Sequence, residues 1–239
     1  FKKGDRTDIE LPAVQRELID ALHRAGKKII LVNCSGSPIG LEPETQKCEA
    51  ILQAWYPGQQ GGKAVAEVLF GDYNPAGKLP VTFYRNVSHL PDFEDYNMTG
   101  RTYRYMQDVP LFPFGYGLSY TTFGYGKTVL DKNELTAGQS LKLTVPVTNT
   151  GKRNGEEVVQ VYLRKQGDAE GPIKTLRAFK RVSIPAGKTV NVEFDLKDKE
   201  LEWWDDQSNT VRVCPGNYHI MVGGSSKEED LQRPTIAIK

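Results

Sequence analysis

The first third of the chain alternates the hydrophobic patterns of helices and strands. Apolar residues recur every three or four positions over residues 11–25, which predicts an amphipathic helix. An unbroken apolar run at 29–32 and a largely apolar stretch at 50–55 predict two short strands buried on both faces. Residues 62–70 predict a second helix that stops at Gly71. Helices that alternate with buried strands indicate an α/β fold with parallel strands. The apolar positions of the first helix are Leu11, Val14, Leu18, Leu22 and Ala25.

The number of strands in this segment is small for such a fold. Only two or three fit into residues 1–85, even when an extended stretch at 79–84 is included. Doubly wound sheets usually have more strands, and an open edge would leave the backbone groups of a buried strand unpaired. We therefore expect residues 1–85 to be the C-terminal part of a larger α/β domain.

Residues 86–120 follow neither periodicity but are rich in aromatic rings. Of the chain's 11 Tyr, 9 Phe and 3 Trp, nearly half lie between Tyr84 and Tyr125. Such rings bury large apolar areas, which a polar and mobile linker does not need. We therefore predict that residues 86–120 form an ordered strap packed between domains. The alternative is that a few of these rings line a binding site.

The remainder of the chain, residues 121–239, has the pattern of a β-structure. Apolar and polar residues alternate at 141–147 and again at 159–163, which is typical of half-buried strands. Turn signals containing Pro and Gly separate the later strands. Seven or so short strands in this length predict an antiparallel β-sandwich. The further strands are expected at 176–184, 190–196, 211–213 and 218–222.

Composition and charge exclude several partners. Lys and Arg number 31 against 30 Asp and Glu, and a net charge of +1 attracts neither nucleic acid nor an anionic membrane. No apolar run approaches the roughly 20 residues of a membrane-spanning helix. The 3 cysteines include no CxxC pair, and we interpret them as buried structural thiols, with Cys34 placed directly after an apolar run.

Few residues indicate chemistry by themselves. The 3 histidines have no spacing suited to a metal ion, so we expect neither a metal nor a cofactor. Ser35 and Ser37 follow a strand with no base placed beside them, which favours a turn over a nucleophile. Trp203 and Trp204 could stack on sugars, but a sandwich needs large core residues, and we interpret them as core or sheet-edge packing.

Several longer motifs, taken together and in order, resemble family 3 glycoside hydrolases. The stretches AWYPGQQGG at 54–62 and VLFGDYNPAGKLP at 68–80 resemble the C-terminal α/β domain of that family. PFGYGLSYT at 113–121 resembles its junction into a fibronectin type III-like domain. GEEVVQVY at 155–162 and LRAFKRV at 176–182 resemble strands of that domain. The resemblance covers essentially the whole chain.

This resemblance implies a fibronectin type III-like sandwich over residues 121–239 and a retaining, exo-acting β-glycosidase that hydrolyses terminal β-linked sugars of oligosaccharides. Retention requires two carboxyl groups about 5–5.5 Å apart. In the family the nucleophile is an Asp of a preceding barrel domain, which is therefore implied as a partner in cis or in trans. The acid/base is usually a Glu shortly before an Asp-Arg pair. Asp5-Arg6 matches that pair with no Glu ahead of it in residues 1–4, so we place the acid/base upstream of Phe1 and assign no catalytic residue within the chain.

Four residues are expected to contribute to substrate binding. Asp5 and Arg6 would lie beside the acid/base, where an Arg–carboxylate pair can hold its loop. GRTYRY at 100–105 resembles a segment of the xylosidase and arabinofuranosidase branch, which favours a β-xylosidase over the alternative, a β-glucosidase. Within it, Tyr103 and Arg104 lie either near the sugar or at the domain junction as braces. A non-catalytic carbohydrate-binding or support module is the alternative of another class. The enzyme implied is secreted or periplasmic.

Overall fold

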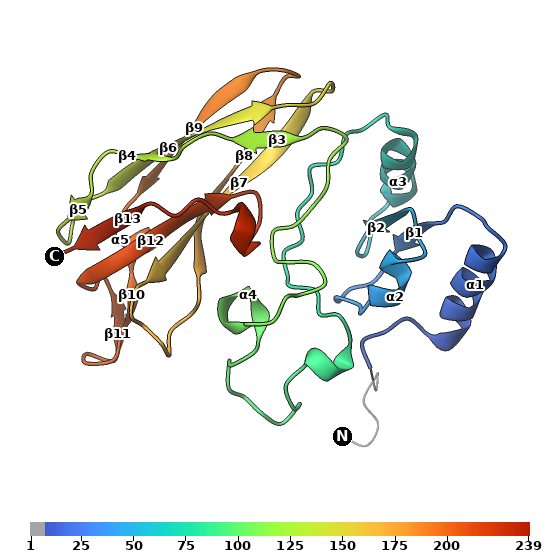
Figure 1. Ribbon diagram of the computed structural model, residues 1–239, viewed down its shortest axis with the longest axis horizontal. Coiled ribbons are helices and arrows are strands. Elements are labelled where there is room, and N and C mark those ends of the chain that lie inside the picture. The colour runs from blue at the N-terminus through green and yellow to red at the C-terminus, as the bar shows by residue number, and fades with distance from the viewer. Residues whose placement is uncertain (1–7) are drawn as a thin grey trace. The chain divides into compact units, whose positions relative to one another are not determined.

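The structure is a computed structural model that describes residues 8–239 (Figure 1). The described chain forms two compact units. The first unit contains residues up to 73 together with 81–101 and 107–113, and the second contains 74–80, 102–106 and 114–239. The predicted strap over 86–120 is therefore divided between the two units, and its boundaries stay a prediction. Each unit is described by itself.

The first unit has the predicted alternation of helices and strands. Strands β1 and β2 pair in parallel, with Ile30 opposite Ala50 and Asn33 opposite Gln53. This confirms the α/β fold class for the first part of the chain. Its elements are α1 (Ala13–Arg24), β1 (Ile30–Asn33), α2 (Glu42–Thr45), β2 (Ala50–Gln53), α3 (Gly61–Phe70) and the 3-10 turn η1 (Val87–His89).

Helix α1 contacts the rest of the first unit through apolar side chains and through ion pairs of Arg16 and Asp20, the latter with Lys47. The Arg16 guanidinium donates to Glu44 Oε1 at 3.0 Å and to Glu10 Oε2 at 2.5 Å. Glu44 is completely buried, so this ion pair fixes the helix against α2. Five buried apolar residues of this unit form one cluster, namely Leu11, Ile19, Ile29, Ile39 and Leu41, and Phe83 is buried outside it.

The predicted burial of the first helix and first strand was wrong in part. The helix forms, but Val14 and Leu18 are 71% and 61% exposed, and the residue of α1 that is buried is Ile19. Ile30 in β1 is 53% exposed, although both faces of that strand were expected to be covered. Two strands make a narrow sheet, and the described elements cover only part of it. Apolar side chains of both α1 and β1 therefore remain accessible on the first unit.

The second unit is an all-β sandwich, as predicted. One sheet has the strand order β5-β13-β12-β7-β8; in the other, β6 pairs with β3, β4 and β9. All pairings are antiparallel except that between β5 and β13. A separate hairpin joins β10 (Trp203–Asp205) to β11 (Thr210–Arg212). The other strands are β3 (Phe123–Tyr125), β4 (Val129–Leu130), β5 (Glu134–Leu135), β6 (Leu141–Asn149), β7 (Gly155–Lys165), β8 (Thr175–Ile184), β9 (Thr189–Leu196), β12 (Gly216–Gly223) and β13 (Thr235–Ile238), with short helices α4 (Thr102–Tyr105), α5 (Asp198–Leu201) and η2 (Glu228–Asp230).

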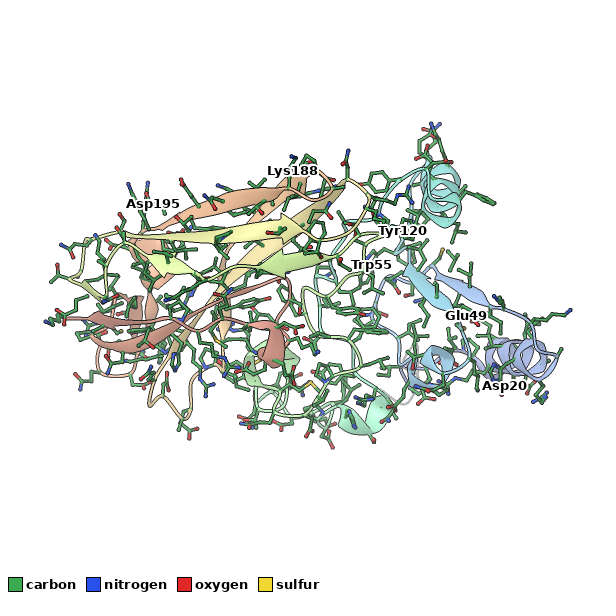
Figure 2. All side chains as sticks on the ribbon, turned by 45° about the horizontal axis from the view of Figure 1, so that its top comes forward. Asp20, Glu49, Trp55, Tyr120, Lys188 and Asp195 are labelled. Carbon is green, nitrogen blue, oxygen red and sulfur yellow. The ribbon has the colours of Figure 1, made fainter. Side chains whose placement is uncertain are left out.

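The period-2 pattern of the strands explains the packing of the two sheets. In β9, Val192 and Phe194 are buried whereas Glu193 and Asp195 are exposed, and Figure 2 shows Asp195 on the outer side of the sandwich. The buried side chains of β6 and β9 share one core cluster with those of β7 and β12. The two sheets thus pack face to face, as the alternation requires.

Candidate functional site

The four residues predicted to bind substrate do not all lie in the described part of the chain. Asp5 and Arg6 are outside the described residues. Tyr103 and Arg104 lie on helix α4 of the second unit. Their surroundings are therefore those of the β-sandwich.

Tyr103 is packed between rings of the second unit. Its ring stacks on Phe114 with centroids 4.3 Å apart and meets Tyr162 edge-on at 5.8 Å. Its hydroxyl accepts a hydrogen bond of 3.1 Å from the backbone N–H of Leu176 in β8. These contacts attach α4 to β7 and β8 within the second unit.

Arg104 is held mainly through its backbone and ring contacts. Its carbonyl accepts a hydrogen bond of 2.6 Å from the N–H of Ile173, and its guanidinium lies 5.7 Å from the ring centre of Tyr105. Arg104 also acts on Arg177, whose pKa is lowered first by burial and then by the charge of Arg104. The substrate-binding role of Tyr103 and Arg104 stays a proposal.

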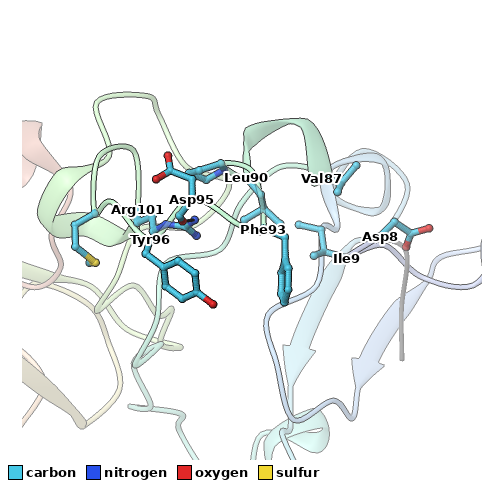
Figure 3. Close-up of a pocket in the computed structure, with 10 residues that line it drawn as sticks. Asp8, Ile9, Val87, Leu90, Phe93, Asp95, Tyr96 and Arg101 are labelled. Atoms are coloured by element: carbon cyan, nitrogen blue, oxygen red, sulfur yellow. Dashed lines mark hydrogen bonds between the residues drawn. The ribbon is translucent and has the colours of Figure 1, made fainter. Parts of the chain in front are cut away.

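A pocket of about 840 Å³ lies in the first unit, next to the first described residues. Asp8 and Ile9 form one side, and the loop of residues 87–101 forms the rest (Figure 3). Aromatic and aliphatic side chains line it together with two carboxylates and one guanidinium, a composition typical of small-molecule sites. The loop residues that line it are Val87, Leu90, Pro91, Phe93, Asp95, Tyr96, Met98 and Arg101. Sequence reasoning did not single these residues out, and the high density of rings between Tyr84 and Tyr125 was the signal for them.

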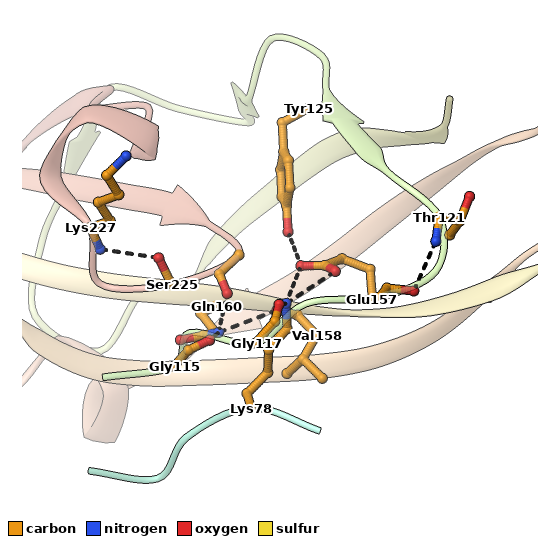
Figure 4. A network of polar contacts seen from close by, with 12 residues as sticks. Lys78, Gly115, Gly117, Thr121, Tyr125, Glu157, Val158, Gln160, Ser225 and Lys227 are labelled. Atoms are coloured by element: carbon orange, nitrogen blue, oxygen red, sulfur yellow. Dashed lines mark hydrogen bonds and ion pairs between the residues drawn. The ribbon is translucent and has the colours of Figure 1, made fainter. Parts of the chain in front are cut away.

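Ionisable groups with shifted pKa values also lie in a buried polar network of the second unit (Figure 4). Glu157 in β7 accepts a hydrogen bond of 2.9 Å from the Tyr125 hydroxyl and lies 3.3 Å from Lys78 Nζ. Burial raises the pKa of Glu157 although Lys78 opposes the change, and burial together with Glu157 raises the pKa of Tyr125. Perturbed groups can mark an active site. Here every group has a partner, and Lys78 also donates to the carbonyl of Gly117 at 3.2 Å.

Gln160, in the same network, fixes the chain segment around Gly115. Gln160 Nε2 donates to the carbonyl oxygens of Gly115 and Gly224, at 3.1 and 2.6 Å. Gly115 has φ +78°, and a Cβ there would lie 2.0 Å from Gln160 Oε1, so only glycine fits. We interpret the network as a structural clamp that holds residues 114–117 on β7.

Other candidate residues have structural partners. The carboxylates that were not assigned to catalysis include Glu10, paired with Arg16, and Glu42, whose Oε1 lies 2.6 Å from the Arg85 guanidinium. Ser35 donates to the carbonyl of Ser37 at 2.9 Å, which confirms a turn. Among the described residues, no group of His, Cys, Asp and Glu could hold a metal ion, and no helix is long and apolar enough to cross a membrane.

The interpretations of the tryptophans and cysteines had different outcomes. Trp203 is buried in the sandwich core and donates to Asp168 Oδ2 at 2.6 Å, so the packing interpretation is confirmed for it, whereas Trp204 is 49% exposed. The prediction of three buried thiols was wrong for Cys34, which is exposed, although Cys214 is buried. The chain turns immediately after β1, and this turn directs Cys34 to solvent.

Comparison with known proteins supports both parts of this architecture. Residues 2–120 match the glycosyl hydrolase family 3 C-terminal domain, and residues 157–226 match the fibronectin type III-like domain. The order of the two domains is that expected from the sequence motifs.

Similar proteins match along nearly the whole chain. A xylan 1,4-beta-xylosidase of Xylanibacter ruminicola is 57% identical over 238 residues, which are 100% of this chain and 27% of that protein. A periplasmic beta-glucosidase of Salmonella typhimurium is 39% identical over 236 residues, covering 93% of this chain and 31% of that protein. The solved structure of a β-glucosidase of Erythrobacter marinus has a TM-score of 0.86 and 41% identity, over 99% of this chain and 31% of that one. The chain thus spans about a third or less of the length of the relatives it matches.

Proposed function

The chain belongs to glycosyl hydrolase family 3, and from this we propose that it forms the C-terminal portion of a retaining, exo-acting β-glycosidase, with β-xylosidase activity favoured. One observation carries the choice of sugar. The identity of 57% to a xylan 1,4-beta-xylosidase over the whole chain exceeds the 39% to a beta-glucosidase. A β-glucosidase of the same family is the second candidate, supported by the solved β-glucosidase structure at TM-score 0.86.

The proposed chemistry needs two carboxyl groups about 5–5.5 Å apart, one as nucleophile and one as acid and then base. We place the nucleophile in the barrel domain of the family and the acid/base before Phe1. In this proposal Asp5 and Arg6 hold the loop of the acid/base by a charge-assisted pair. The 239-residue chain then supplies positioning and substrate contacts, not the reacting carboxylates.

The exposed apolar side chains of the first unit support the proposal that a larger partner covers them. Val14, Leu18 and Ile30 are each more than half exposed, although an amphipathic helix and a short parallel strand normally bury such side chains. Full burial of one such side chain is worth about 1.5–3 kcal/mol. We propose that another part of a family 3 enzyme covers these side chains, in cis or in trans.

We further propose that the enzyme acts outside the cytoplasm, in the periplasm or after secretion. The support is the 39% identity to a protein named as a periplasmic beta-glucosidase. Cell fractionation of the source organism with an antibody against the chain tests this. A signal confined to the cytoplasm contradicts it.

An activity assay tests where the carboxylates lie. The chain alone, incubated with 4-nitrophenyl β-xyloside and β-glucoside, is expected to release no nitrophenol above the rate of a buffer blank. The enzyme that also contains the barrel domain is expected to hydrolyse the xyloside. Robust turnover by the chain alone refutes the placement of both carboxylates in other parts of the enzyme.

A further inference from the structure

Two aromatic rings of the loop 87–101 project into the open pocket. Phe93 is 80% exposed and Tyr96 is 92% exposed, and Figure 3 shows both rings pointing the same way from the loop, with Ile9 beside Phe93. What distinguishes them from other exposed rings is that both line one pocket, where their faces are available for stacking on a ligand. The two rings thus give the pocket an accessible apolar surface.

The loop is ordered by its polar contacts and not by burial of these rings. Arg101 donates from Nε to the carbonyl of Asn97 at 3.0 Å and from NH2 to the carbonyls of Asp92, at 3.1 Å, and Asp95. Asp92 Oδ1 accepts from the N–H of Glu94 at 2.9 Å, and Asp95 Oδ1 accepts from the N–H of Asn97 at 2.9 Å. One guanidinium therefore connects three carbonyls of the same loop. This arrangement orders the backbone that carries the rings before any ligand arrives, which lowers the entropic cost of binding.

The charges around the pocket indicate a neutral ligand rich in hydroxyl groups. The only cationic side chain that lines it among the described residues is Arg101, whose donors are engaged by the loop carbonyls. Asp8 and Asp95 supply carboxylates, which accept hydrogen bonds and repel anions. A sugar ring satisfies both features, because its C–H face packs on an aromatic ring while its hydroxyls donate to carboxylate oxygens.

We propose that this pocket is a sugar-binding subsite that stacks a neutral pyranose on Phe93 and Tyr96. Its assignment to the leaving-group side of the substrate rests on the proposed function, because an exo-acting enzyme cleaves off one terminal sugar and the rest of the oligosaccharide extends from the catalytic centre. Asp8 and Ile9 follow Asp5-Arg6 closely in sequence, which links the pocket to the landmark of the acid/base. Sugar binding itself does not depend on catalysis.

A binding titration with the 239-residue chain tests the subsite directly. Xylotriose is added at millimolar concentrations, and the ring signals of Phe93 and Tyr96 are followed by NMR. We expect saturable shifts, and Phe93→Ala or Tyr96→Ala is expected to weaken binding about three- to tenfold. Phe70→Ala and Tyr56→Ala serve as matched controls, since these rings are 84% and 80% exposed on other segments of the same unit. No saturable shift, or equal weakening by the controls, overturns the proposal.

A third substitution separates the geometry of the loop from its charge. Arg101→Lys keeps the positive charge but cannot connect three carbonyls, so we expect weaker xylotriose binding with unchanged helix and strand content by circular dichroism. Inorganic phosphate is the anionic probe and is expected to cause no shifts. Unchanged xylotriose binding by Arg101→Lys, or phosphate binding that competes with xylotriose, contradicts the proposed sugar site.

Kinetics with the barrel-containing enzyme separate this proposal from the proposed function. Phe93→Ala is expected to raise KM for xylotriose about three- to tenfold, whereas the control Phe70→Ala is expected to leave it unchanged. An active enzyme whose loop variants leave KM for xylotriose unchanged refutes the subsite and retains the glycosidase. Xylotriose binding by the loop in an enzyme without glycosidase activity retains the subsite and refutes the proposed function. Loss of assembly with the barrel domain in the loop variants, with xylotriose binding unchanged, shows that the rings contact protein and overturns the subsite.

Discussion

Loss of the ion pair between Lys78 and Glu157 should lower the stability of the second unit by an amount that can be worked out from the structure. Lys78 Nζ lies 3.3 Å from the carboxylate, and at an effective dielectric constant of about 20 this attraction is roughly 5 kcal/mol. Burial of Glu157 opposes this attraction and raises its pKa. The net stabilisation by the pair is therefore much smaller than the attraction. Substitution of Lys78 leaves Glu157 buried without its counter-charge, so it reveals the free-energy cost of burying that carboxylate.

Lys78→Met leaves the carboxyl group buried, with the Tyr125 hydroxyl still donating to it. The carboxyl then takes up a proton, because a buried charge without a counter-charge costs more. At pH 7.5, about three pH units above the ordinary pKa of 4.5, protonation costs about 4 kcal/mol at about 1.36 kcal/mol per unit. The native protein already carries part of this cost, because its Glu157 pKa is raised too. We therefore expect a loss of about 3 kcal/mol in the free energy of unfolding.

The effect should depend on pH in a definite direction. A carboxyl group whose pKa is raised on folding favours the folded state fully below its unfolded pKa, and this contribution is lost as pH rises through the folded-state pKa. Without Lys78 the folded-state pKa of Glu157 rises further, so the destabilisation grows with pH. At pH 4 only the hydrogen bonds of Lys78 are lost, and we expect about 1 kcal/mol.

Urea unfolding at pH 4 and pH 7.5, followed by tryptophan fluorescence, measures both values. Lys63→Met is the control, because Lys63 is 71% exposed and forms a 3.7 Å surface pair that contributes less than about 0.5 kcal/mol. The double variant Lys78→Met/Glu157→Gln should recover most of the loss at pH 7.5, since it removes the buried acid. A loss that is equal at both pH values, or larger at pH 4, would refute the reasoning.

Three further predictions concern the second unit and the first strand. Tyr103→Phe removes the hydroxyl that accepts a hydrogen bond from the N–H of Leu176 in β8, and should lower the free energy of unfolding in urea by about 1 kcal/mol. KM for 4-nitrophenyl β-xyloside should not change. A raised KM with full stability would instead indicate a substrate contact. Cys34 should react with Ellman's reagent in the folded chain, whereas the buried cysteine of the sandwich should react only after unfolding; equal rates would contradict the exposure seen here. Hydrogen bonds from Ser208 and Arg212 lower the pKa of Asp205 to about 2, so its stabilising effect is present above pH 3.8 and is lost as pH falls through about 2. Arg212→Gln should raise the Asp205 midpoint in a carboxyl-carbon NMR titration, and an unchanged midpoint would contradict that cause.

The elements that could be predicted are those with a long and regular hydrophobic period. Helix α1 and strands β6 and β9 follow such patterns, because each repeatedly places apolar residues on one face. Strands β4 and β5 have only 2 residues each, too few to show a period, and they were missed. Burial was harder to predict than secondary structure. Val14 and Ile30 lie on faces that the pattern assigns to a core, but the described elements do not cover them.

The candidate site could be predicted only in outline. A high density of rings indicated that the segment after Tyr84 contains either packing or binding residues, and the structure shows both packed rings and exposed rings there. Tyr103 is packed, whereas Phe93 and Tyr96 are exposed in a pocket. The loop that carries the two exposed rings is joined by bonds from Arg101 to its backbone carbonyls. Backbone acceptors are the same in every residue, so no sequence pattern reveals such a contact.

The most direct test of the central claim compares two substrates with the enzyme that contains this chain and its barrel domain. kcat/KM is measured for 4-nitrophenyl β-xyloside and 4-nitrophenyl β-glucoside under identical conditions. We expect hydrolysis of the xyloside, with or without hydrolysis of the glucoside. kcat/KM should be at least about tenfold higher for the xyloside, which corresponds to about 1.4 kcal/mol more transition-state stabilisation. A higher kcat/KM for the glucoside would contradict the xylosidase assignment, and hydrolysis of neither substrate would contradict the glycosidase function.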